Sequence, residues 1–242
     1  MTPRVLHLPL AVGDQTLNEE ASHHLISVLR LKAGDTLTLF NGRGLEGKAR
    51  VVRADRLATQ VHVDAVEEVR RESPVHTTVV QALCTGDKMD WVVQKSTELG
   101  AARIIGLAAE RSVLKLDAMR AEKRRLHWQS IAESAAAQCG RNNVPEVLPV
   151  MRLADVIAHW EACAAPKTGW LLDPFATVPL SQANMEGNVM LMIGPEAGWS
   201  DPEETQLHRA GFIGVACGPR ILRTETAAAV VLSAIAVRCG EF

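Results

Sequence analysis

The sequence lacks several features that mark common protein classes. Its five cysteines, at positions 84, 139, 163, 217 and 239, form no C-x-x-C pair, so neither a zinc site nor a disulfide framework is indicated. The eight histidines form no H-E-x-x-H motif, and we expect no metal site. The longest apolar stretch, Ala227 to Val237, is too short to span a bilayer and contains Ser233. The N-terminus has no apolar segment typical of a secretory signal. These absences predict a reduced, cytoplasmic protein with no membrane contact.

An excess of charge of either sign is also missing. The chain has 26 Lys and Arg against 28 Asp and Glu, a net charge of −2, so any contact with nucleic acid has to come from local patches. Apolar residues make up 47% of the 242 residues, which is typical of a globular protein and not of a disordered one. This length accommodates one large domain or two small ones with a substantial core.

The C-terminal third has the clearest pattern. Asn188–Ile193 is an unbroken apolar run, as expected of a strand buried on both faces. A loop rich in Gly and Pro follows, and then Ser200 with Glu203 three residues on, the signature of a helix start. A second strand, Phe212–Ala216, leads into a loop and an Ala-rich helix, Ala227–Arg238. The two loops leave the carboxyl ends of what we predict to be adjacent buried strands, where open α/β sheets bind ligands.

These loops contain two motifs that together resemble the signature of the RsmE family of SPOUT-class methyltransferases: Ile193-Gly-Pro-Glu-Ala-Gly-Trp-Ser200 and Gly218-Pro-Arg-Ile-Leu-Arg-Thr-Glu-Thr-Ala227. The resemblance covers nearly the whole chain, and its other motifs are His24–Leu31, Gly86–Trp91, Gln94–Gly100 and Gln138–Asn142. Two departures are Ala197, where the family usually has Gly, and Cys217, where it usually has Leu. Both are small changes beside backbone contacts, so we expect altered packing and not lost activity.

The resemblance implies both a fold and a function. The fold is an α/β SPOUT domain with a parallel sheet and a deep trefoil knot, preceded by a PUA-like β-barrel that helps to bind RNA. The function is transfer of a methyl group from S-adenosylmethionine to N3 of a specific uridine in small-subunit ribosomal RNA, within the assembled small subunit. The family forms homodimers through the knotted region, which implies active sites completed by both subunits.

The sequence places a boundary between two domains after residue 72. Residues 1–72 contain short strand-like runs with turns and one helix, which predicts a small β-barrel, and the polar linker Arg70–Pro74 follows. Residues 73–242 alternate strands and helices, which predicts a mostly parallel sheet. In the first domain we predict a helix over Glu19–Val28 and strands at Thr36–Phe40, Lys48–Arg53 and Gln60–Val66. In the second, before the C-terminal third, we predict strands at Val75–Leu83, Arg103–Leu107 and Trp170–Leu172 and helices over Met89–Leu99 and Asp117–Cys139.

The two Gly- and Pro-rich loops allow two interpretations. They are ordinary strand-to-helix turns, or their backbone approaches a ligand closely and its N–H and C=O groups contact an adenine edge. The match of both motifs to one family favours a ligand, S-adenosylmethionine. The implied cofactor-binding residues come from the two loops and from a third strand: Leu171, Leu172, Asp173, Ile193, Gly194, Pro195, Glu196, Gly198, Val215, Cys217, Gly218, Ile221, Leu222 and Thr226.

Arg223, Glu225 and Glu196 are the candidate catalytic residues. Methylation of N3 of uracil requires removal of an imide proton, which a carboxylate accepts, and stabilisation of charge on the flanking oxygens, which an arginine provides. Asp173 is a further candidate base. The alternative for Glu225 is structural, either an ion pair with Arg223 or a favourable charge at the start of the last helix.

Basic and amide side chains supply the candidate RNA contacts. Between Arg111 and Arg125 there are six basic residues and two acidic ones, which indicates phosphate contact or an ordinary solvated helix face. The polar loop after residue 137 suits RNA, but its Gly and Asn also suit the end of a helix. Lys95 has a helix ion pair with Glu98 as its alternative. The candidates are Arg4, Arg30, Lys88, Lys95, Arg111, Lys115, Arg124, Gln138, Arg141 and Asn142.

Two rival functions remain open on the sequence alone. One is a SPOUT enzyme that methylates a different base or a different atom. The other is a non-catalytic RNA-binding module that keeps an adenosine pocket for stability. The two classes differ in turnover, because a catalytic protein loses methyl transfer but keeps its fold when Arg223 is replaced by alanine.

Overall fold

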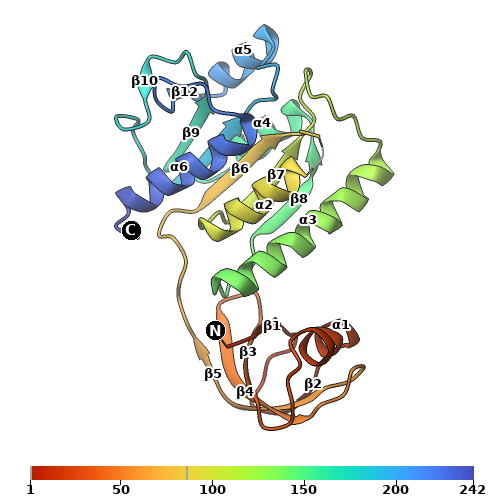
Figure 1. The fold of residues 1–242 in the computed structure, drawn as a ribbon. Helices are drawn as coiled ribbons and strands as arrows, with labels where there is room; N and C mark the ends of the chain where they lie inside the picture. Colours follow the sequence, from red (N-terminus) through yellow and green to blue (C-terminus); the bar gives the residue numbers. More distant parts are fainter. Residues whose placement is uncertain (1, 86) are drawn as a thin grey trace. The chain divides into compact units, whose positions relative to one another are not determined.

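The computed structural model describes residues 2–85 and 87–242 (Figure 1). Met1 and Gly86, the first residue of the Gly86–Trp91 motif, lie outside the described residues. The chain divides into two compact units, the first comprising residues 1–72 and 136–144 and the second residues 73–135 and 145–242. Residues 136–144, which the sequence assigns to the second domain, therefore belong to the first unit.

The first unit is built on a five-stranded sheet in the order β1-β3-β4-β5-β2. β1 pairs with β3 in parallel, and the other three pairs are antiparallel. The three predicted strands are confirmed, and the predicted helix is present as an α-helix continued by a π-helix. Two short strands were not predicted. The elements are β1 (Arg4–Leu6), β2 (Gly13–Thr16), α1 (Glu19–His23), η1 (His24–Val28), β3 (Thr36–Phe40), β4 (Leu45–Arg53) and β5 (Gln60–Glu68).

Alternating hydrophobicity explains how this sheet forms its core. In β5, Val61 and Val63 are fully buried while the residues between and before them are exposed, so one face packs inward and the other faces solvent. Leu25 of η1 joins the same cluster. The sheet curls, since the side chain of His7, just after β1, lies 3.1 Å from that of Gln15 in β2 (Nε2 to Oε1).

The second unit is built on a seven-stranded sheet in the order β10-β12-β9-β11-β6-β7-β8, and every pair in it is parallel. The predicted parallel α/β organisation is confirmed. The elements are β6 (Thr77–Ala82), α2 (Lys88–Glu98), β7 (Arg103–Leu107), α3 (Ala118–Cys139), β8 (Glu146–Met151), α4 (Leu153–Ala162), β9 (Lys167–Leu172), β10 (Val178–Pro179), β11 (Asn188–Ile193), α5 (Asp201–Arg209), β12 (Ile213–Ala216) and α6 (Thr224–Arg238). Of these, β8, α4 and β10 were not predicted, and the last residues of α3, from 136 on, lie in the first unit.

The strand order corrects one prediction. The strands that carry the two motifs, β11 and β12, are not adjacent, because β9 pairs with both of them. β12 is also less buried than predicted, since Ile213 is 50% exposed. The carboxyl ends of parallel strands lie at one edge of a sheet. Three loops therefore meet there, those that follow β9, β11 and β12.

Helices cover both faces of the parallel sheet (Figure 1). Trp160 of α4 and Leu207 of α5 pack with strand residues Val80 and Met192 in one buried cluster. α2 and α6 contact each other, and Lys88 Nζ in the first turn of α2 lies 3.9 Å from Glu225 Oε2 in the first turn of α6, so the N-termini of the two helices are close together. None of the helices in the described residues has the length and apolarity needed to cross a membrane.

The starts of the last two helices decide where the site residues lie. α5 begins as predicted, with Ser200 donating its backbone N–H to the Glu203 carboxylate at 3.2 Å. α6 begins at Thr224, three residues before the predicted start, with Arg223 at its N-cap. A glutamate in the first turn is favoured by the partial positive charge of a helix N-terminus. Glu225 is therefore a helix residue and not part of the loop.

Gly187, between β10 and β11, is a position where we expect a side chain to be strongly destabilising. Its φ is +61°, and a Cβ atom would lie 1.9 Å from the Pro166 carbonyl oxygen. We expect Gly187→Ala to lower the free energy of unfolding by about 2–4 kcal/mol, measured by urea denaturation. Gly211→Ala is the matched control, because Gly211 has φ +90° but no atom within 4 Å of the added Cβ. Equal losses for the two variants would contradict the steric argument.

Candidate functional site

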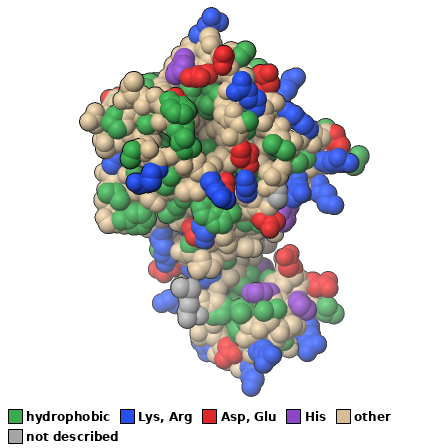
Figure 2. All heavy atoms as spheres, turned by 45° about the horizontal axis from the view of Figure 1, so that its top comes forward, with side chains coloured by type: hydrophobic (Ala, Val, Ile, Leu, Met, Phe, Trp, Pro, Cys, Tyr) green, Lys and Arg blue, Asp and Glu red, His purple; other side chains and the backbone are tan. Residues whose placement is uncertain are grey.

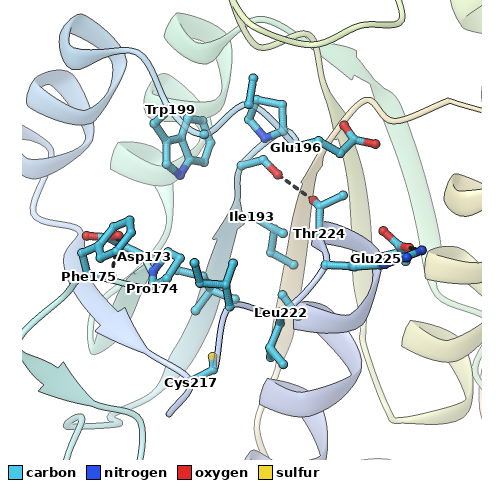
Figure 3. A pocket seen from close by; sticks show the side chains of 18 of the residues that line it. Asp173, Pro174, Phe175, Ile193, Glu196, Trp199, Cys217, Leu222, Thr224 and Glu225 are labelled. Atoms are coloured by element: carbon cyan, nitrogen blue, oxygen red, sulfur yellow. Dashed lines mark hydrogen bonds and ion pairs between the residues drawn. The ribbon is translucent and has the colours of Figure 1, made fainter. Parts of the chain in front are cut away.

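A cavity of about 650 Å³ lies at the carboxyl edge of the parallel sheet (Figure 3). This volume is in the range of small-molecule sites. The loop after β9 supplies Asp173 and Phe175 on one side, and the start of α6 supplies Thr224 and Glu225 on the other. Trp199 closes a further side. The predicted meeting of the motif loops is therefore present, with the β9 loop as a full third wall.

Most of the residues predicted to bind cofactor line this cavity. They are Leu172, Asp173, Ile193, Gly194, Pro195, Glu196, Gly198, Val215, Cys217, Ile221 and Leu222. Leu171, Gly218 and Thr226 are not among the described residues that line it. Leu171 points into the core cluster because successive residues of a strand face opposite sides. The cavity is also lined by residues absent from that prediction: Pro174, Phe175, Ala197, Trp199, Glu204, Arg220, Thr224 and Ala227. All of them except Phe175 and Glu204 directly adjoin a predicted residue, so those two give no signal in the sequence.

Glycines keep the backbone of the cavity accessible. A Cβ atom on Gly194 would lie 2.9 Å from Trp199 Nε1, so a side chain there would displace the indole ring. Gly198 has a φ of +74°, a region that other residues rarely adopt. The cavity thus combines backbone without side chains, at Gly194 and Gly198, with apolar side chains. This combination fits a nucleoside, whose base is flat and whose edge forms hydrogen bonds.

Charged side chains gather at one end of the cavity. Lys88 Nζ donates a hydrogen bond to Glu196 Oε1 at 2.8 Å and lies 3.9 Å from Glu225 Oε2. Arg223 Nη1 lies 4.0 Å from Glu225 Oε1. Burial acts to raise the pKa of Glu196, but the hydrogen bonds from Lys88 and from backbone outweigh it, and that pKa is lowered. The three predicted catalytic residues are thus brought together, and Lys88, predicted to contact RNA, lies among them.

Thr224 connects the two motif loops. Its hydroxyl donates a hydrogen bond to the Gly194 carbonyl oxygen at 2.6 Å and accepts one from Gln81 Nε2 at 2.8 Å. Gln81, at the end of β6, is fully buried. Because Thr224 stands between Arg223 and Glu225 in the chain, this contact also fixes the start of α6 relative to the β11 loop.

Three residues predicted to contact RNA instead pair with other residues of the first unit. Asn142 is fully buried and donates to the Val69 carbonyl oxygen at 3.1 Å. Arg141, 5% exposed, pairs with Glu72. Arg4 forms an ion pair with Glu46 at 2.9 Å. These buried groups satisfy one another, so the structural alternative for the 138–142 loop is favoured over RNA contact.

Glu46 makes the first unit sensitive to acid. The pKa of Glu46 is lowered from 4.5 to about 2, mainly because Arg71 donates hydrogen bonds to it, with Arg4 and Asn142 contributing against the effect of burial. Since the folded pKa is below the unfolded one, the stabilisation is present above pH ~4.5 and is lost as pH falls toward 2; it amounts to at most about 3 kcal/mol.

We therefore expect Glu46→Gln to lower stability at pH 7 and to lose less stability than the unchanged protein on acidification to pH 3. Urea denaturation followed by circular dichroism measures both. Glu68→Gln is the control, since Glu68 is 57% exposed and pairs only at the surface with Arg70. Parallel pH dependences for the unchanged protein and Glu46→Gln would contradict the assignment.

The remaining residues predicted to contact RNA lie at the surface, and their environments differ. Lys95 pairs with Glu98 at 2.8 Å, as its structural alternative predicts. Arg111 donates to the Trp199 carbonyl oxygen at 2.8 Å, and Lys115 donates to the Glu110 carbonyl oxygen at 2.8 Å. Arg30, Arg124 and Gln138 are exposed. Figure 2 shows basic side chains interspersed with acidic ones over the visible face, consistent with local patches only.

Comparison with known proteins identifies the family. Residues 71–236 match the family described as RNA methyltransferase domain, and residues 17–63 match the RNA methyltransferase PUA domain. A Bacillus subtilis protein named ribosomal RNA small subunit methyltransferase E is 33% identical, covering 91% of this chain and 88% of that protein. A Mycobacterium bovis protein of the same name is 34% identical, covering 95% and 88%. The chain belongs to the RsmE family. The predicted resemblance is therefore confirmed, as is a PUA domain at the N-terminus.

Solved structures of similar proteins contain the methyl donor. A methyltransferase from Legionella pneumophila, in complex with the bound cofactor SAM, has a TM-score of 0.92 and 35% identity, with 98% of each chain covered. A ribosomal RNA small subunit methyltransferase E from Neisseria gonorrhoeae, bound to S-adenosyl methionine, has a TM-score of 0.89 and 34% identity, again with 98% of each chain covered. These RsmE-like chains share the whole fold described above.

Proposed function

We propose that this protein transfers a methyl group from S-adenosylmethionine to N3 of a uridine in small-subunit ribosomal RNA. The observation that supports this most is the cavity at the carboxyl edge of the sheet, lined by both RsmE motifs. Relatives 33–34% identical are named ribosomal RNA small subunit methyltransferase E. The uridine and its N3 atom come from the family resemblance and are the finer part of the proposal.

The cavity residues fit S-adenosylmethionine. Leu172, Ile193 and Leu222 would contact the adenine faces, and backbone groups of the two glycine-containing loops would bond to its edge. When bound, the cofactor supplies an electrophilic methyl group on a sulfonium. Holding uracil N3 in line with that methyl supplies much of the rate.

The charged end of the cavity suits the uridine of the RNA substrate. N3 of uracil carries a proton that a carboxylate can accept, and Glu196 and Glu225 both line the cavity. The negative charge that then spreads to the flanking uracil oxygens is stabilised by a nearby cation, for which Arg223 is positioned. Glu196, Glu225 and Arg223 thus keep the catalytic roles proposed for them.

The test uses radiolabelled S-adenosylmethionine and small ribosomal subunits from cells that lack the gene. Digestion of the RNA and chromatography of its nucleosides identify the product. Label in N3-methyluridine supports the full proposal. Label in another nucleoside contradicts the base or atom assignment and favours a SPOUT enzyme of different specificity. Cofactor binding without label favours the non-catalytic RNA-binding module.

Further parts of the proposal concern assembly and partners. We propose that the first unit, with Arg30 and Gln138, and four basic residues of the second unit contact ribosomal RNA phosphates. These are the half-buried Lys95 and the exposed Arg111, Lys115 and Arg124. The trefoil knot, the homodimer formed through it, the assembled small subunit as substrate and a cytoplasmic location follow from the family resemblance and stay predictions.

A further inference from the structure

We infer that Glu225 is the general base of the proposed reaction and that Lys88 is a positioning residue that occupies Glu196 and leaves Glu225 free to accept the proton. This inference rests on the proposed function, and it chooses among the four carboxylates that line the cavity: Asp173, Glu196, Glu204 and Glu225. The general base is the carboxylate whose oxygen atoms accept no hydrogen bond from the described residues of the protein.

The Glu225 carboxylate accepts no hydrogen bond from another side chain among the described residues. Its side chain is 16% exposed, and Oε2 is buried without a hydrogen-bond partner among the described residues. The nearest cations, Lys88 Nζ at 3.9 Å and Arg223 Nη1 at 4.0 Å, are beyond hydrogen-bond distance. A nearly buried carboxylate without a bonded donor is uncommon, since such groups are normally satisfied. Glu225 therefore keeps acceptor lone pairs that no donor among the described residues occupies.

The other three carboxylates already have partners. Glu204 Oε1 lies 3.6 Å from His208 Nε2, one turn further along α5. Glu196 accepts the Lys88 hydrogen bond at 2.8 Å and has a lowered pKa, which makes it a weaker base. Asp173 accepts the backbone N–H of Phe175 at 2.9 Å through Oδ1. A carboxylate that is held by a bonded donor has fewer lone pairs for a substrate and binds a proton less readily. The geometry thus separates the carboxylates into one base and three groups that already have partners.

Lys88 is the reason that Glu196 is hydrogen-bonded and Glu225 is not. It is the first residue of α2, and its ammonium faces Glu196 from the β11 loop and Glu225 from α6. Cys84 is the other titratable group in this surrounding, and its pKa is raised to about 12 by burial and by Glu196, so it stays neutral. The hydrogen bond to Glu196 raises the pKa of Lys88, so it remains charged. One ammonium thus opposes the mutual repulsion of two carboxylates.

The step balances with these groups alone. The N3–H bond of uracil breaks and its proton moves to a Glu225 oxygen, while the N3–carbon bond forms as the sulfur–methyl bond breaks. The pair of electrons in that bond stays on sulfur, so the sulfonium becomes a neutral thioether. The proton then leaves Glu225 for solvent through the open side of the cavity.

The experiment measures single-turnover methyl transfer to small subunits against pH, together with binding of S-adenosylmethionine by calorimetry. We expect Glu225→Gln to lower the rate at least about 100-fold with unchanged cofactor affinity, and Glu225→Asp to retain part of the rate. Lys88→Met should move the acid limb of the pH–rate profile to higher pH, because removal of a cation 3.9 Å from a carboxylate favours the protonated form. Glu196→Gln should move that limb down, because the Lys88 charge then acts on Glu225 alone.

The controls separate this inference from the proposed function. Arg103→Met breaks an exposed pair with Glu146 at 3.5 Å in the same unit and should leave the acid limb in place. Lys88→Met with Glu196→Gln should bring the limb back toward its normal position. A near-normal rate for Glu225→Gln, or an unmoved limb for Lys88→Met, overturns the inference while methyl transfer stands. Absence of transfer by the unchanged protein overturns the proposed function, and the inference with it.

Discussion

Replacement of Arg223 by alanine is expected to reduce the rate of methyl transfer by about 100- to 1000-fold without altering the fold. Arg223 is the N-cap residue of α6, and its side chain is 83% exposed, so the fold gains little from it. Its guanidinium is 4.0 Å from Glu225, a distance at which an exposed ion pair adds little stability. In the proposed reaction it faces the charge that develops on the uracil oxygens, where a fixed cation matters most.

The measurement is single-turnover transfer, with thermal unfolding and cofactor titration alongside. Arg223→Lys should recover part of the rate, since it keeps the charge but loses the planar fork. Arg209→Ala, at the exposed end of α5, is the control and should leave the rate within about twofold, as a surface change away from the site does. An unchanged rate for Arg223→Ala would remove Arg223 from the proposed mechanism. A fall in the unfolding temperature of several degrees would point to a structural role.

Removal of the Thr224 hydroxyl is the second change expected to have a large effect. Valine has nearly the same shape, but Thr224→Val leaves the Gly194 carbonyl oxygen and one N–H of the Gln81 amide without their partner. Gln81 Nε2 keeps its second bond, to the Ala82 carbonyl oxygen. Each unpaired buried group costs about 1–3 kcal/mol. Both groups lie where β11 and α6 meet the cavity. We expect cofactor affinity to fall by about 30- to 1000-fold.

Thr224→Ser is the matched control, because it keeps the hydroxyl and should bind cofactor within a few-fold of normal. Gln81→Glu is a further test. A carboxylate cannot donate a hydrogen bond to Thr224. It would instead accept the hydrogen bond that the Thr224 hydroxyl donates to the Gly194 carbonyl oxygen in the unchanged protein. It should weaken cofactor binding as well. Calorimetry with S-adenosylmethionine measures all three variants. Equal affinities for Thr224→Val and Thr224→Ser would show that the hydroxyl does not organise the cavity.

The strongest local signals predicted the elements that support the site. Asn188–Ile193 and Arg103–Leu107 are confirmed residue for residue, because a buried strand of a parallel sheet is a continuous apolar run. The start of α5 is also confirmed, because Ser200 and Glu203 form a capping box that is local in sequence. Loops that follow such strands could therefore be placed at one edge of a sheet, and most of the cavity lining followed from that.

Features that depend on tertiary pairing were not predictable. Nothing local in the sequence shows that β9 inserts between β11 and β12, since strand order is a property of the whole sheet. α6 begins earlier than predicted because the run of alanines obscures the helix-compatible Thr224 and Glu225 before it. The internal pairing of Arg141 and Asn142, in place of the predicted RNA contact, was not predictable for the same reason. Their partners, Glu72 and Val69, are about 70 residues away in the chain.

The return of residues 136–144 to the first unit has a consequence for dissecting the protein. The polypeptide passes between the units three times, near residues 72, 135 and 144. A fragment ending at residue 72 would lack Arg141 and Asn142, leaving Glu72 and the Val69 carbonyl without their partners. A fragment starting at residue 73 would carry those two polar side chains without a place to bury them. Deletion at the apparent boundary therefore damages both halves, and only the intact chain is a sound starting point for separating RNA contact from methyl transfer.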